Sequence, residues 1–160
     1  MSEQHNLTHS LSEEELCLYR EHGYLIRESV FSVDELADLT ASVERAVSLA
    51  HDQSSSGQAY HLDGKRFVDI GNMTVQFEQG DKDEIIRVIE PAHHLDAFLE
   101  MLVEDVRIVE PVKSIIGVDQ VSVWTNKLNL KRAGKGSGFG WHQDSPYWVH
   151  DCDHVNLLPN

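Results

Sequence analysis

The stretch Gly140-Trp-His-Gln-Asp-Ser-Pro-Tyr-Trp148 holds the most informative residue pattern of this chain. Residues two apart in an extended segment face the same side, so His142 and Asp144 are predicted to point at one spot. An imidazole nitrogen and a carboxylate oxygen can take two corners of one metal face. With a further histidine they form the 2-His-1-carboxylate triad of mononuclear non-haem iron(II) sites. We therefore predict that His142 and Asp144 are metal ligands and catalytic residues.

The sequence around this H-x-D pattern strengthens a signal that alone often arises by chance. Residues 118–130 are rich in Val, Trp, Thr and Leu and predict a strand. Residues 133–140 hold four glycines and predict a flexible loop. The alternatives are a hydrogen-bonded histidine without a metal, and plain core packing of three aromatic residues: Trp141, Tyr147 and Trp148.

The charge of the chain restricts its partners. With 13 basic and 27 acidic residues the formal net charge is −14, which disfavours nucleic acid and anionic membrane surfaces. Between Asp119 and Asp144 there is no acidic residue, and the interval holds four cations. This local charge of +4 is either a solvated loop or a site for an anionic ligand beside the metal. The cations are Lys127, Lys131, Arg132 and Lys135.

Other features favour a cytoplasmic enzyme or binding protein. The N-terminus has no basic start with an apolar run, and no stretch has the apolar length of a membrane span. The cysteines, Cys17 and Cys152, form no disulfide framework. A competing cluster is the run from His150 to His154, whose two histidines would share one helix face and could bind zinc. It lacks the glutamate of the H-E-x-x-H pattern.

The sequence predicts both helices and strands. Ser12 with Glu15, and Ser32 with Glu35, match the capping box that begins a helix. The first helix should end at Gly23 and the second near Ala50. Further helices are predicted around residues 91–103 and over residues 106–116. Strands are predicted at residues 24–26, 66–70 and 73–77, and residues 1–10 are expected to be disordered.

Two separated motifs carry a family resemblance. Asn129-Leu-Lys131, the glycine-rich loop and Gly140–Trp148 resemble the phytanoyl-CoA dioxygenase family. The opening run from Leu11 to Leu36, with Tyr19-Arg-Glu-His-Gly-Tyr-Leu-Ile26, resembles the start of that family. The resemblance extends from about residue 11 to the end of the sequence.

The resemblance implies a fold, an activity and a site. The implied fold class is α+β, with outer N-terminal helices and an incomplete double-stranded β-helix (jelly-roll) core, in a single domain over residues 1–160. The implied activity is that of an iron(II)- and 2-oxoglutarate-dependent dioxygenase that uses O2 on a small-molecule substrate. His142 and Asp144 would be iron ligands, and the presence of Asp144 favours hydroxylation over halogenation. By position, the candidates that line the co-substrate pocket are Asn129, Lys131 and Trp148.

The resemblance also implies residues that this sequence does not contain. The distal histidine of the family, and the arginine that pairs with 2-oxoglutarate, lie on later strands. We expect the chain to be about the N-terminal half of such an oxygenase and to be inactive or nearly so. Unpaired sheet edges would favour self-association. The alternative is a non-catalytic jelly-roll fragment that serves as a binding or assembly module.

Overall fold

The computed structural model describes residues 9–80 and 84–149, which divide into two compact units. A mainly helical unit is formed from Met1–Ser32, Val103–Ser122 and Asp144–Asn160. A sheet unit is formed from Val33–Leu102 and Val123–Gln143. The expectation of one domain over residues 1–160 stays a prediction, and residues 1–8 lie outside the described residues.

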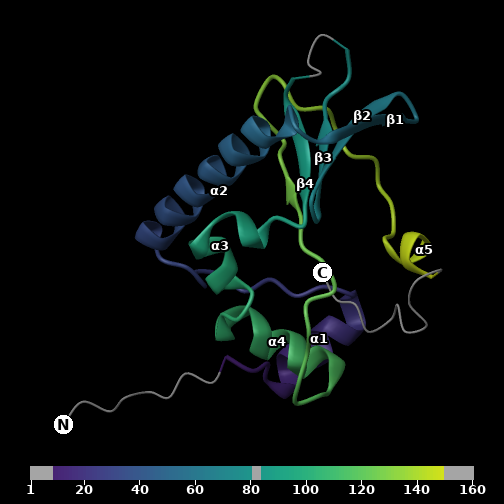
Figure 1. The fold of residues 1–160 in the computed structure, drawn as a ribbon. Coiled ribbons are helices and arrows are strands. Elements are labelled where there is room, and N and C mark those ends of the chain that lie inside the picture. The colour runs from purple at the N-terminus through teal and green to yellow at the C-terminus, as the bar shows by residue number, and fades with distance from the viewer. Residues whose placement is uncertain (1–8, 81–83, 150–160) are drawn as a thin grey trace. The chain divides into compact units, whose positions relative to one another are not determined.

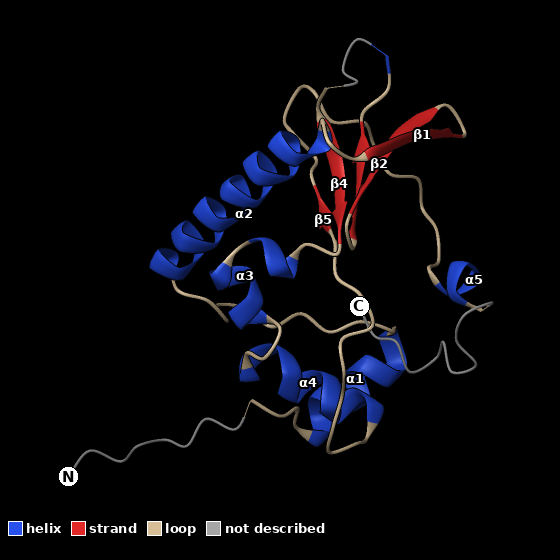
Figure 2. Ribbon diagram, viewed as in Figure 1, coloured by secondary structure: helices blue, strands red, loops and turns tan. Residues whose placement is uncertain are grey.

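The sheet unit is built on an antiparallel sheet in the order β1-β2-β3-β4-β5 (Figure 2). The first four strands follow one another in the chain, and β5 joins β4 through the pairs Val88–Asn129 and Ile89–Leu128. This arrangement confirms an α+β fold. The strands are β1 (Gln58–Leu62), β2 (Lys65–Ile70), β3 (Met73–Phe77), β4 (Ile86–Glu90) and β5 (Leu128–Asn129).

One face of the sheet is covered by the long helix α2 (Val33–Ser54), as Figure 1 shows. Met73, Val75 and Phe77 alternate along β3 with less buried residues, so a single face of that strand points into the core. Ala50 of α2 is buried in the same cluster, and Val47 packs against it. The predicted strands at 66–70 and 73–77 are confirmed, and α2 begins as predicted but runs four residues beyond Ala50.

Asp96 interrupts the helix that was predicted around residues 91–103. The structure has a short 3-10 helix, η2 (His93–Leu95), then α3 (Ala97–Leu102), with Asp96 in an extended conformation between them. The Asp96 carboxylate accepts hydrogen bonds from the Ser42 hydroxyl at 2.6 Å and from Arg45 Nε at 2.7 Å. It also accepts from the amide of Phe98 at 2.9 Å. These bonds join α3 to α2 and explain why a continuous helix does not form.

The helical unit confirms two predicted helices. In α1 (Glu13–His22), Ser12 Oγ accepts from the Glu15 amide at 3.2 Å and Glu15 accepts from the Ser12 amide at 2.9 Å. This is the predicted capping box. Helix α4 (Val106–Ile116) ends at Gly117, which is left-handed at φ 79°. The Ser114 hydroxyl of α4 accepts from the Leu11 amide at 3.1 Å. A short helix, α5 (Ser145–Trp148), also belongs to this unit.

One strand prediction is wrong, and another is confirmed only at its end. Residues 24–26 form no strand, and Tyr24 and Ile26 are 63% and 74% exposed, because no described strand lies beside them to complete a ladder. Of residues 118–130, Leu128–Asn129 form the strand β5, and the Leu130 amide also donates to the Arg87 carbonyl of β4 at 2.8 Å. The preceding residues bond through side chains instead. Asn126 Oδ1 accepts from the amides of Ala92 and His93 at 2.8 and 3.1 Å.

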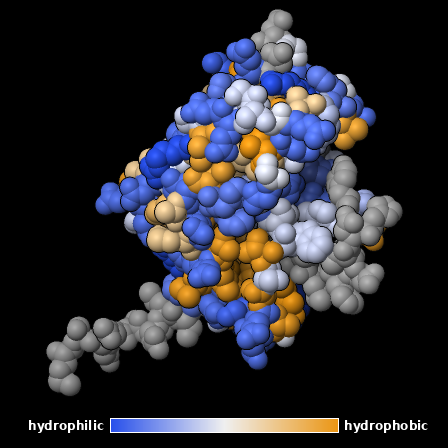
Figure 3. All heavy atoms as spheres, viewed as in Figure 1, coloured by the Kyte–Doolittle hydropathy of each residue, from blue (hydrophilic) through white to orange (hydrophobic). Residues whose placement is uncertain are grey.

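Apolar side chains remain at the surface in both units, as the orange patches of Figure 3 illustrate for one face. Ile26 of the helical unit and Val33 and Met101 of the sheet unit are among the exposed ones. Within the described ranges, no helix combines the length and the apolar character that a membrane crossing requires.

Candidate metal centre

The ring of His142 forms a hydrogen bond with the backbone of its own segment. Its Nδ1 lies 2.7 Å from the carbonyl oxygen of Gly140. A carbonyl can only accept, so Nδ1 carries the proton, and in the neutral ring Nε2 holds the lone pair. Metal-bound histidines commonly donate their second ring nitrogen to a backbone carbonyl in this way. This bond fits the chemistry of a metal-binding histidine, and the assignment of His142 as a ligand stays a prediction.

Asp144 lies at a bend directly before α5 and is partly buried. Residues 141–144 form no strand, so the alternation of a strand does not orient His142 and Asp144 here, and their pointing to one spot stays a prediction. The chain turns there because α5 begins at Ser145. His142 belongs to the sheet unit and Asp144 to the helical unit. The assignment of both as metal ligands stays a prediction.

The H-x-D pattern occurs twice more in the chain, which the sequence reasoning overlooked. In His94-Leu-Asp96, the carboxylate is already used by Ser42, Arg45 and the Phe98 amide. In His61-Leu-Asp63, the pattern lies at the end of β1, and Asp63 has a positive φ of 52° in the turn to β2. His61 and Asp63 therefore provide a matched control for substitutions of His142 and Asp144.

The candidate co-substrate residues come from different elements. Asn129 is exposed on β5, opposite Val88 of β4. Lys131 follows β5 and places its Nζ 5.1 Å from the centroid of the Phe139 ring, in the glycine-rich loop. Trp148 lies in α5 of the helical unit and is partly buried. Within the sheet unit, the structure thus brings Lys131 to the loop that leads to His142.

The basic interval is less charged than its sequence suggests. Arg132 forms two hydrogen bonds with Glu44 of α2, at 2.5 and 2.9 Å, which lower the pKa of Glu44. Lys127 Nζ lies 3.2 Å from Glu90 of β4. These carboxylates are distant in sequence, so a count of charges along the chain could not include them. The local charge of +4 is therefore an overestimate of what an anion would meet.

A buried ion pair holds the glycine-rich loop, and the sequence reasoning missed it. Glu78, directly after β3, and Arg87 of β4 are 3% and 8% exposed and lie 3.4 Å apart. Both bond to Ser137 of the loop. Burial would raise the pKa of Glu78, but hydrogen bonds from Ser137 and the charge of Arg87 outweigh it and lower that pKa. The sequence signal that could have indicated a buried ion pair was the arginine within the apolar run Ile-Arg-Val-Ile.

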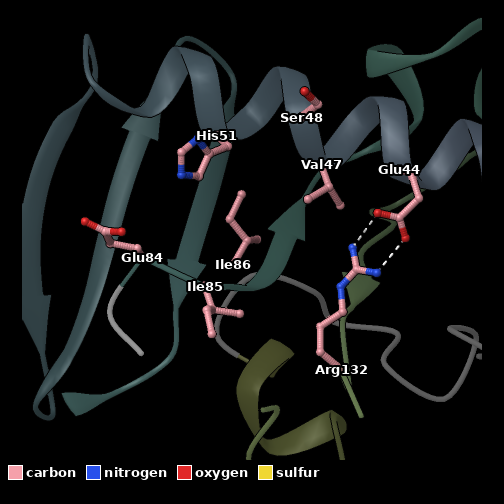
Figure 4. Close-up of a pocket in the computed structure, with 8 residues that line it drawn as sticks. All are labelled: Glu44, Val47, Ser48, His51, Glu84, Ile85, Ile86 and Arg132. Atoms are coloured by element: carbon pink, nitrogen blue, oxygen red, sulfur yellow. Dashed lines mark hydrogen bonds and ion pairs between the residues drawn. The ribbon is translucent and has the colours of Figure 1, made fainter. Parts of the chain in front are cut away.

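A pocket of about 310 Å³ lies between α2 and the turn before β4 (Figure 4). Its apolar floor includes Val47 and Ile86, and the Glu44–Arg132 ion pair closes one side. None of the predicted site residues lines it. Arg132, one of the four cations of the basic interval, does line it.

No group of three or more His, Cys, Asp or Glu side chains placed to hold a metal occurs in the described part of the chain. The alternative zinc cluster at His150 and His154 lies outside the described residues.

Comparison with known proteins identifies the family. The family model described as "Phytanoyl-CoA dioxygenase (PhyH)" matches residues 19–159, so the chain belongs to this family of dioxygenases. The chain is 29% identical to an ectoine dioxygenase of Bordetella parapertussis over 139 residues, which cover 87% of the chain and 39% of that protein. It is 24% identical to a probable alpha-ketoglutarate-dependent hypophosphite dioxygenase of Stutzerimonas stutzeri, over 84% of the chain and 42% of that protein.

A third relative is the L-proline trans-4-hydroxylase of Streptomyces griseoviridis, which is 30% identical over 77 residues. That match covers 48% of the chain and 28% of the relative. The chain spans about two-fifths of the length of the first two curated relatives, as the 39% and 42% shares state.

Proposed function

We propose that the chain is part of an iron(II)- and 2-oxoglutarate-dependent dioxygenase that hydroxylates a small molecule, with His142 and Asp144 as two of the iron ligands. The observation that carries the proposal is the bond from His142 Nδ1 to the Gly140 carbonyl, since metal-binding histidines commonly donate one ring nitrogen to a backbone carbonyl. Membership of a dioxygenase family supports the reaction class. The names of the relatives support a small-molecule substrate: ectoine, hypophosphite and L-proline.

The residues of the chain would hold the reacting groups rather than perform the oxidation. Iron(II), with 2-oxoglutarate and O2, would supply the oxidising chemistry when bound. His142 Nε2 and the Asp144 carboxylate are the donors that this chain offers, a nitrogen and an oxygen ligand suited to iron(II). Lys131, held near Phe139, would offer a cation to a carboxylate of 2-oxoglutarate, while Asn129 and Trp148 are further candidates. The antiparallel sheet is consistent with part of a jelly-roll.

Anaerobic titration with iron(II), followed by calorimetry, tests the metal ligands. We expect His142→Ala and Asp144→Ala each to weaken iron(II) binding by a factor of ten or more, because each removes one donor. The matched controls are His61→Ala and Asp63→Ala, which alter an H-x-D pattern at the end of β1. Equal binding by all four variants would refute the assignment.

Succinate formation with iron(II), 2-oxoglutarate and candidate substrates tests the activity. Turnover that is lost in His142→Ala and kept in His61→Ala would support the dioxygenase. A stable chain that binds neither iron(II) nor 2-oxoglutarate would favour the alternative, a non-catalytic binding or assembly module.

A further inference from the structure

The face of the sheet opposite α2 carries a row of side chains that the strand register defines. Residues directly opposite one another in an antiparallel sheet lie on the same face. The row that contains Val68, Val75 and Ile89 is buried in the core that α2 covers. The neighbouring row therefore points away from α2. It crosses all the strands and ends at a candidate co-substrate residue: Tyr60, Phe67, Gln76, Val88 and Asn129.

Asp69 of β2 lies on this same face, in a second row. Its carboxylate accepts from the Thr74 hydroxyl at 2.7 Å and from the Tyr60 hydroxyl at 3.4 Å, and both partners are neutral. Glu90, which lies opposite Thr74 in the same row, instead faces Lys127 at 3.2 Å. Among the residues that the structure describes, Asp69 thus has hydroxyl partners and no cation, while Glu90 has its charge compensated.

Two aromatic rings stand beside this carboxylate. Tyr60 and Phe67 stack with their centroids 5.4 Å apart and their planes at 11°. Partial burial raises the pKa of the Tyr60 phenol, and the charge of Asp69 raises it further, so the carboxylate acts electrostatically on this ring. The faces of aromatic rings themselves attract cations. Carboxylate and rings therefore favour the same sign of charge in a ligand.

We propose that Asp69 and the stacked pair of Tyr60 and Phe67 bind a positively charged nitrogen of a small organic molecule. The carboxylate supplies the opposite charge, and the rings supply an apolar wall that attracts a cation. A ligand can reach both, because Asp69 is exposed and Tyr60 is 38% exposed. One carboxylate suits an organic cation better than a metal ion, which requires several charged or polar ligands.

The position of this cation site defines a class of substrate. Asp69 in β2 and Asn129 in β5 are three strands apart, which is about 14 Å at about 4.8 Å per strand. That span accommodates two small molecules side by side, 2-oxoglutarate at Asn129 and a molecule with an ammonium or amidinium group at Asp69. Gln76 of β3, which is half-buried between them, would offer its amide to either. That the cation is the substrate rests on the proposed function.

Choline and its uncharged isostere 3,3-dimethylbutan-1-ol are the probes, since they differ in charge but hardly in shape. Proton NMR titration of the chain measures their binding. We expect the wild type to bind choline about tenfold more tightly than the isostere. Asp69→Asn should lose this preference, because the amide still accepts from the Thr74 hydroxyl but carries no charge. Equal binding of the two probes by the wild type, or an unchanged preference in Asp69→Asn, would overturn the inference.

Asp63→Asn is the matched control. It removes one carboxylate from the same hairpin, in the turn between β1 and β2, where asparagine tolerates the positive φ of 52°. It should bind choline like the wild type, and a loss equal to that in Asp69→Asn would show a general effect of charge and overturn the inference. If Asp69→Asn does not fold by circular dichroism, Tyr60→Leu on the edge strand decides: weaker choline binding supports the site, and unchanged binding overturns it.

Titration with iron(II) separates this inference from the proposed function. A wild type that prefers choline through Asp69 but binds no iron(II) would refute the metal centre and leave the cation site intact. A wild type that binds iron(II) through His142, but binds choline no better than the isostere, would overturn the cation site and leave the metal centre standing.

Discussion

Asp96 shows how one side chain can determine the local course of the backbone. Its carboxylate side chain is mostly buried and accepts three hydrogen bonds, which join α2 to the start of α3. The hydrogen bonds from Arg45 and Ser42 hold the pKa of Asp96 far below its usual range. Because the folded form binds this proton more weakly than the unfolded chain, the contribution to stability exists above the unfolded pKa and is lost as pH falls.

Asp96→Asn is therefore expected to destabilise the chain most at neutral pH. A hydrogen bond to a charged group contributes about 2 kcal/mol, and we expect a loss of that order in the free energy of unfolding at pH 7. The difference from the wild type should shrink below about pH 4, where the unfolded carboxyl becomes protonated. Urea unfolding at several pH values measures it. Asp52→Asn, at an exposed carboxylate of α2, is the control, and a pH-independent difference would contradict the explanation.

The elements differ in how far their sequences determine them. Local signals mark the ends of two helices: the capping box of Ser12 and Glu15 begins α1, and Gly117 caps the end of α4. Both helices were predicted with nearly correct bounds. Strands depend on partners that are distant in the chain. Strand β4 was not predicted. Its Arg87 can be buried there only because Glu78 and the glycine-rich loop bind its guanidinium.

The candidate site likewise combines residues that local sequence reveals with residues that depend on distant partners. His142 was identified from a local pattern and a resemblance, and its bond to Gly140 is also local. Glu78 and Arg87 could not be identified with it, since they are 50 residues or more from the Ser137 that they contact. The pairing of Arg132 with Glu44 spans 88 residues and could not be predicted from the local sequence either.

Gly57 gives a prediction at the scale of the sheet. A Cβ at this position would lie 2.4 Å from Val68 Cγ1 and 2.7 Å from the backbone oxygen of Asp69, both in β2. Gly57→Ala should therefore force β1 away from β2 and cost about 1 to 3 kcal/mol, as overpacking does. Thermal unfolding measures the change. Gly138→Ala, where a Cβ would meet nothing within 4 Å, is the comparison, and equal stability of the two variants would argue against this packing.

At the scale of the whole molecule, charge dominates the behaviour. The formal net charge of −14 opposes a phosphate backbone. We expect the chain to bind a labelled DNA duplex with a Kd weaker than about 10⁻⁴ M at physiological salt, the weak end of non-specific binding. Fluorescence anisotropy is the measurement. Tight binding that disappears at high salt would show that a local basic surface overrides the net charge.

The meander of β1 to β4, closed by β5, has a consequence for the order in which the protein folds. The first four strands pair with their sequence neighbours, whereas β5 reaches β4 only after the residues between Glu90 and Leu128 have been brought round. Loop closure costs entropy before the new contacts repay it, so local hairpins form sooner than such a pairing. The segment that carries His142 would then be the last part of the sheet unit to assemble. A metal ion added early in refolding would therefore meet the paired strands β1 to β4 before the segment that carries His142 has joined them.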